Sequence, residues 1–157
     1  MDRDVLEAIR NLLTSQRVLA LAVLVDGEPE AGLLPYALRA DYGAVYVQAS
    51  GLARHARGLQ PGARVGVLVH ANDTPDADPM QIPRLTVQAT VGLIDRAGEQ
   101  FDPASALFIA RFPTAEMTLS LGDFNLYELV FGRGRYVEGF ARAFNLGPDT
   151  FRDVASL

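Results

Sequence analysis

The chain has 157 residues, the size of one ordinary domain, and we expect a single domain over residues 1–157. Hydrophobic residues make up 49% and charged residues 21%, which favours a folded chain with a sizeable core over a disordered one. A net charge of −5 argues against nucleic-acid binding. The absence of Cys excludes disulfides and thiolate chemistry. Two His are too few for a three-His metal site, so no metal centre is expected.

No targeting or membrane segment is visible in the sequence. Met1 to Arg17 carries mixed charges and no small-residue cleavage site, which is unlike a secretory signal. The longest apolar run, Val18 to Val25, is far shorter than the roughly 20 residues that a membrane helix needs. We therefore expect a cytoplasmic protein that does not enter a membrane.

The first segment predicts an amphipathic helix, with Asp2 or Asp4 at its N-cap. Its apolar residues recur at helical spacing and should face the core: Val5, Leu6, Ile9, Leu12 and Leu13.

Strand patterns dominate the rest of the chain. The predicted strands are Val18–Asp26, Glu28–Arg39, Ala44–Ser50, Ala63–His70, Leu85–Val91, Phe124–Phe131 and Arg135–Phe140. The first two are joined by the turn Asp26-Gly27, and the last two by a predicted hairpin turn at Gly132-Arg133-Gly134. Six or seven closely spaced strands indicate a mainly β fold, a small antiparallel barrel with short helices at its corners.

Two helices are predicted between the strands. One spans about Leu52 to Leu59. The other begins with Asp102 as N-cap and Pro103 at the first position, and ends at Phe112 before Pro113. The segment Ala71–Pro83 is expected to be a loop, since it is rich in Asp and Pro.

Positive charge is concentrated locally. Between Tyr42 and Asn72 there is no Asp or Glu, although the stretch contains Arg54, Arg57, Arg64, His55 and His70. Ser50-Gly51 ends a predicted strand and begins a predicted helix, whose first N–H groups would be unsatisfied. Ser50, Arg54 and these N–H groups therefore form a candidate phosphate site.

An alternative remains open at this point. The same arginines could lie on a solvated helix face and pair with Asp or Glu elsewhere in the chain. Likewise, His55 and His70 could both be hydrogen-bonded structural residues, and Tyr36 could be a packing residue.

Several segments resemble a known family. Pro29 to Leu38, Ala49 to Leu59, Pro83 to Val87, Arg111 to Pro113 and Gly139 to Ala143 occur in the order found in the pyridoxamine 5'-phosphate oxidase-like FMN-binding split barrels. Within that family the chain is most similar to the branch of haem-utilisation proteins of the HugZ and HutZ type. The resemblance implies a Greek-key split β-barrel.

The resemblance also implies a homodimer with FMN between the subunits. Its implied phosphate contacts are Ser50, Arg54 and His55, beside Ala49 at the end of the strand. Leu34, Pro35 and Tyr36 match the strand along the isoalloxazine ring, and Arg84 would reach the cofactor from the partner subunit. Gly32 stands roughly where the oxidase branch carries an Arg.

The expected function is that of an FMN-dependent oxidoreductase acting on a small-molecule substrate or electron donor. No side chain is identified as a general acid or base, although Tyr36 would lie near the ring. The alternatives are a haem-binding or haem-degrading protein on the same barrel, and a non-catalytic flavin-binding module.

Overall fold

The computed structural model describes residues 1–157 and is mainly β. The strands are β1 (Val18–Val25), β2 (Glu28–Leu38), β3 (Ala44–Ser50), β4 (Arg64–His70), β5 (Arg84–Leu93), β6 (Phe124–Gly139) and β7 (Arg142–Leu146). The α-helices are α1 (Arg3–Ser15), α2 (Phe101–Arg111), α3 (Ala115–Ser120) and α4 (Pro148–Ala155). Two short 3₁₀ helices, η1 (Arg54–Gly58) and η2 (Pro79–Gln81), lie in the loops.

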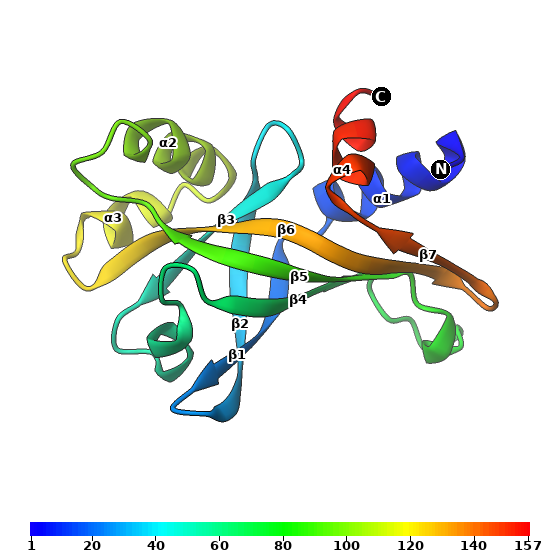
Figure 1. Cartoon of the computed structure of the whole chain (residues 1–157), viewed down its shortest axis with the longest axis horizontal. Helices are drawn as coiled ribbons and strands as arrows, with labels where there is room; N and C mark the ends of the chain where they lie inside the picture. The colour runs from blue at the N-terminus through cyan, green and yellow to red at the C-terminus, as the bar shows by residue number, and fades with distance from the viewer.

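The strands form a closed antiparallel barrel, which confirms the predicted split-barrel fold. Their order is β3-β2-β1-β4-β5-β6-β7, and an additional pairing of β3 with β6 closes the first six into a barrel (Figure 1). The seventh strand, β7, extends the sheet beyond the closure as the partner of β6 in a long hairpin. The apolar faces of the strands meet inside the barrel as the main core.

Local sequence explains the first hairpin. Asp26 and Gly27 both adopt positive φ, 54° and 82°, as the tightest strand connections require. This turn sets the register that pairs Val25 with Glu28 and Leu19 with Leu34. Leu19 and Leu34 then both face the core.

Helices cover only part of the barrel. α1 and α4 pack together at one end, where all five residues predicted for the apolar face of the first helix are buried. α2 and α3 pack over β2, β3 and the first half of β6, around a second small core that includes Phe108 and Leu119 (Figure 1). The outer faces of β1, β4 and β5 remain exposed or half-buried.

The end of the chain differs from the sequence prediction. The predicted turn at Gly132-Arg133-Gly134 is wrong, because β6 runs through it and turns into β7 only at Phe140 and Ala141. The register shifts by one residue between Val87 and Ala89 of β5, so these glycines form a β-bulge in β6.

The helix boundaries also need correction. α2 begins at Phe101 with Gln100 at the N-cap, so Asp102 lies in the first turn and is not the cap. The helix predicted over Leu52–Leu59 is only the five-residue η1. α3, β7 and α4 were not predicted. No helix is long and apolar enough to cross a membrane.

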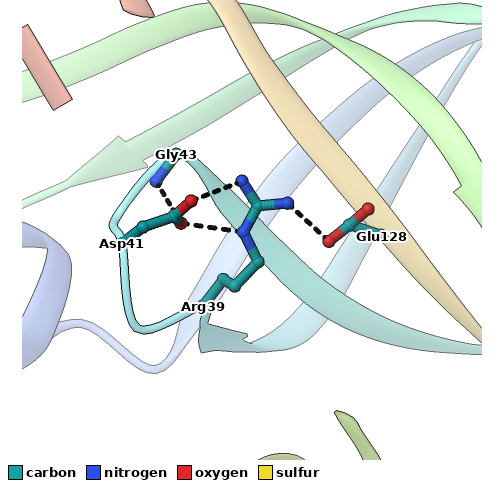
Figure 2. Close-up of polar contacts among 4 residues, drawn as sticks. All are labelled: Arg39, Asp41, Gly43 and Glu128. Carbon is teal, nitrogen blue, oxygen red and sulfur yellow. Dashed lines mark hydrogen bonds and ion pairs between the residues drawn. The ribbon is translucent and has the colours of Figure 1, made fainter. Parts of the chain in front are cut away.

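An ion-pair network holds the β2–β3 turn against β6. Arg39 donates two hydrogen bonds to the Asp41 carboxylate and a third, of 2.7 Å, to Oε1 of Glu128 (Figure 2). The Asp41 carboxylate also accepts the N–H of Gly43, and the hydrogen bonds from Arg39 hold its pKa below the ordinary value. The network therefore joins the turn to the strand that closes the barrel.

Candidate functional site

The corner between β3 and η1 carries Ser50, Arg54 and His55, and the three N–H groups between Ser50 and Arg54 are satisfied within the chain. The Gly51 N–H donates to the Asp123 carbonyl at 2.6 Å, that of Leu52 to Oγ of Ser50, and that of Ala53 to the Ser50 carbonyl. The loop before η1 turns back on Ser50 and contacts the segment before β6, whereas the N–H groups of Arg54 and His55, the first two residues of η1, donate no hydrogen bond.

The arginines of the corner are paired with acids from other elements. Arg54 forms an ion pair with Glu30 of β2, and Arg57 with Asp26 of the β1–β2 turn. Ser50 donates its hydroxyl to the Asp123 carboxylate at 3.2 Å. Two arginines of the positively charged stretch, Arg54 and Arg57, are thus paired with acids, as the alternative interpretation expected.

His55 lies between the corner and the barrel. A Cβ on Gly32 of β2 would stand 2.9 Å from Cγ of the imidazole, so the ring fills the place that a side chain at position 32 would take. Its Nε2 is buried and has no hydrogen-bond partner. His55 therefore brings one unused polar atom into an apolar environment.

The strand residues implied by the resemblance are mostly part of the core. The side chains of Leu34, Tyr36 and Ala49 are buried, and Pro35 is half-buried. The Tyr36 hydroxyl donates to the Leu13 carbonyl at 2.7 Å, and burial raises its pKa to about 12. This side chain packs in the core, and its proton is held far from any surface ligand.

Arg84 lies on β5, three strands away from β2. Its guanidinium donates to the carbonyls of Met80 and Ile82, which belong to the loop before the strand. Within one chain the structure does not bring Arg84 to the corner.

A groove of about 600 Å³ lies on the uncovered outer face of β1, β4, β5 and β6. We call it the sheet groove. Small residues form its floor, because Ala22 pairs with Ala31 on one side and Gly66 on the other. At its β5–β6 side lie Thr86, Gln88, Arg133, Gly134 and Arg135. The β-bulge thus forms one wall of the groove.

Sequence reasoning missed this groove, although a signal was present. Val18 to Val25 is apolar at every position, whereas an antiparallel strand with one solvated face alternates apolar and polar residues. The outer residues of β1 are correspondingly apolar and partly exposed, Val18 at 45% and Leu24 at 63%. Leu33 of β2, 68% exposed, extends the same surface, which indicates that something covers it.

No protein-family model matches the chain. Among curated proteins, it is 27% identical over 151 residues to the haem oxygenase HutZ of Vibrio cholerae, covering 95% of this chain and 85% of that protein. A haem-binding protein from Mycobacterium smegmatis superposes with a TM-score of 0.83 at 24% identity, over 98% of this chain. The chain spans only 62% of the length of that structure.

The fold extends to flavin proteins. An FAD-binding protein from Mesorhizobium loti matches with a TM-score of 0.63 at 15% identity, over 83% of this chain and 89% of that one. The chain is therefore a split-barrel protein. Its fold is that of the pyridoxamine 5'-phosphate oxidase-like split barrels, and its sequence is similar, at 27% identity, to the haem-utilisation protein HutZ.

Proposed function

We propose that this protein binds haem and serves in haem utilisation. The observation that carries this proposal is the sheet groove, a cavity of about 600 Å³ that is open on an apolar sheet face and has arginines along one side. A cavity of this size is typical of small-molecule sites. The similarity to the haem oxygenase HutZ over 95% of the chain supports the same ligand.

The residues present fit haem in their chemistry. The apolar floor of the groove suits a porphyrin ring, and the arginines at its side suit the two carboxylates of the ring. His70, at the end of β4, lies on the same outer face of the sheet. Bound haem would supply the redox and oxygen chemistry, and the chain would bind and orient it and keep water away from one side. Whether the protein degrades haem or only carries it is decided by product analysis after addition of a reductant and oxygen.

We further propose that two copies associate through the outer face of β1 and β2. Ala20, Ala22, Leu24, Ala31 and Leu33 present a continuous apolar surface there, without a helix over it. An isologous dimer would bury the same patch on both subunits. The sheet groove, which shares Ala20, Ala22 and Ala31 with this patch, would then open at the subunit boundary.

A second candidate function is FMN binding at the corner, as an oxidoreductase with a small-molecule substrate. The unpartnered Nε2 of His55 favours it, because a ligand hydroxyl or phosphate could satisfy that atom. In this candidate the phosphate is bound by Ser50, Arg54 and His55. The flavin ring is supported from the same subunit by Leu34, Pro35, Tyr36 and Ala49. Arg84 reaches the cofactor from the partner subunit. Arg54 would have to leave Glu30 to bind the phosphate.

One titration experiment separates the two candidates. Purified protein is titrated with haemin, followed by its Soret absorbance, and with FMN, followed by flavin fluorescence. We expect saturable binding of about one haemin per chain and much weaker FMN binding. If FMN binds tightly and haemin does not, the haem proposal is wrong.

The corner is tested separately if FMN does bind. Arg54→Ala should then weaken FMN binding by about 1.5–3 kcal/mol, the usual cost of losing a charge-assisted hydrogen bond, and leave riboflavin affinity unchanged. Arg57→Ala is the matched control, because it removes a neighbouring arginine that is also paired with an acid.

A further inference from the structure

The arginines that line the sheet groove have no acidic partner. No Asp or Glu is among the residues that line the groove. Arg133 forms no ion pair or hydrogen bond, and Arg135 contacts only the neutral Oδ1 of Asn145, at 3.2 Å. Nearby, Arg64 donates only to Gln88. In a chain with a net charge of −5, an acidic group is therefore attracted to the β5–β6 side of the groove more than to the corner.

A histidine lies on the same outer face. Outward-facing residues alternate along β4 as Arg64, Gly66, Leu68 and His70, and both Gly66 and Leu68 line the groove. His70 is exposed and follows Leu68 by one full strand repeat. It therefore stands at the end of the sheet groove, beside its apolar floor.

The hydrogen bond of His70 leaves one ring nitrogen free for a metal. Nδ1 lies 2.8 Å from the Ala71 carbonyl oxygen, which can only accept a hydrogen bond. In the neutral ring the proton is therefore on Nδ1, and Nε2 carries a free lone pair. Metal-ligating histidines characteristically donate their second N–H to a carbonyl or carboxylate in this way.

His70 and Arg135 lie near each other on the outer face of the sheet. His70 pairs with Arg84, which pairs with Val137, and Arg135 lies two residues from Val137 on β6. Two strand spacings of about 4.8 Å and two residue rises of about 3.4 Å place the Cα atoms of His70 and Arg135 about 12 Å apart. Both side chains lie on the outer side of the sheet.

We infer that His70 ligates the haem iron through Nε2, while Arg133 and Arg135 bind the carboxylates of the porphyrin. This inference rests on the proposed haem function and places the ligand on β4–β6 of the sheet groove. His55, the only other His, is a poorer ligand, because its ring is packed against Gly32 and its Nε2 is buried.

The absorption spectrum of the ferric haem complex tests the iron ligand. His70→Ala should change the Soret position and the spin state, and added imidazole should restore the wild-type spectrum. His55→Ala is the matched control and should leave the spectrum unchanged. The assignment would be overturned if His70→Ala kept the wild-type spectrum, or if only His55→Ala changed the Soret position and the spin state.

Haemin binding by variants that lack one arginine charge tests whether Arg133 and Arg135 bind the carboxylates. Arg133→Gln and Arg135→Gln should each weaken haemin binding about tenfold, the equivalent of one charge-assisted hydrogen bond. The dimethyl ester of haemin, which has no free carboxylate, should bind both variants as it binds the wild type. Arg152→Gln, an exposed arginine on α4 paired with Asp149, is the control.

The two proposals fail in different ways. If the wild type binds no haemin, the proposed function itself fails. If the wild type binds haemin and the Arg133 and Arg135 variants bind it equally well, the function stands and the placement in the sheet groove is wrong.

Discussion

The imidazole ring of His55 occupies the space beside the α-carbon of Gly32. A Cβ at position 32 would stand 2.9 Å from Cγ and 3.0 Å from Nδ1 of the ring, closer than side chains tolerate. Gly32 on β2 thus leaves the space that the His55 ring on η1 fills, and the two residues pack as a pair. The corner keeps its shape because these two residues fit each other.

Gly32→Ala should therefore destabilise the protein. The added methyl group has to displace the His55 ring, and we expect the free energy of unfolding to fall by about 1–3 kcal/mol in chemical denaturation. In a His55→Ala background the same change should be neutral or slightly stabilising, because Ala is preferred to Gly in a strand. Equal losses in both backgrounds would show that the contact with His55 is not the cause.

Tyr36 should be the last of the five tyrosines to ionise. Burial raises its pKa from about 10 to about 12 in the folded chain. The neutral hydroxyl therefore stabilises the fold fully below pH 10, and this contribution is lost as the pH rises through 12. Tyr36→Phe should remove the most alkaline step from an ultraviolet titration. It should also lower stability at neutral pH by about 1–3 kcal/mol, because the Leu13 carbonyl loses its donor.

Arg39→Met should weaken the closure of the barrel. Glu128, whose side chain is 18% exposed, would lose its cation, and we expect a loss of about 1–3 kcal/mol at pH 7. Because Arg39 lowers the pKa of Asp41, its contribution is present above the ordinary value of 3.8 and disappears as the pH falls through the lowered value. The difference between variant and wild type should shrink accordingly in acid.

The control for this prediction is Arg3→Met, which removes an exposed pair with Glu7 on α1. It should cost less than about 0.5 kcal/mol. Similar losses for both variants would mean that Arg39 stabilises the fold no more than a surface arginine does.

Gly134→Ala should be among the most harmful single changes. A Cβ at this position would lie 2.4 Å from the Thr86 carbonyl oxygen and 3.0 Å from Cβ of Val87, so β5 and β6 would have to separate. We expect a loss above about 2 kcal/mol in denaturation curves. Gly122→Ala, where a Cβ would meet nothing within 4 Å, should change stability by less than about 0.5 kcal/mol.

Leu33→Lys should convert the proposed dimer into monomers. The lysine would place a charge in the centre of the apolar face of β1 and β2, and light scattering coupled to size exclusion measures the mass directly. Met117→Lys is the control, since Met117 is equally exposed, at 70% against 68%, but lies on α3. A wild-type chain that is monomeric at micromolar concentration would contradict the dimer proposal.

The spacing of apolar residues and the turn residues predicted the helix and strands of the first part of the chain well. The first helix, the strands up to β5 and the Asp26-Gly27 turn follow from spacing and turn residues, and the structure confirms the strand bounds within two residues. The bulge at Gly132-Arg133-Gly134 was misread as a turn, because glycines also occur where two backbones approach closely. α4 was missed because its pattern is only eight residues long.

The candidate site was harder to predict because charge pairs form between distant segments. The sequence around Arg54 and Arg57 contains no acid, yet Glu30 and Asp26 reach them across the β1–β2 hairpin. Arg133 and Arg135, by contrast, have no acidic partner, and they lie in and beside the segment predicted to be a turn. Only the pairing of β5 with β6 reveals that they border a cavity.

The junction of β3 with β6 joins segments from opposite halves of the chain, such as Ala44 with Val130 and Ser50 with Phe124. Contacts so distant in sequence form slowly, so the barrel should mature only after most of the polypeptide has been synthesised. The ligand-bearing surfaces do not exist before that step. A ligand that recognises only the mature barrel would then raise the melting temperature with the logarithm of its concentration, a thermal-shift signature that newly made, open chains cannot give.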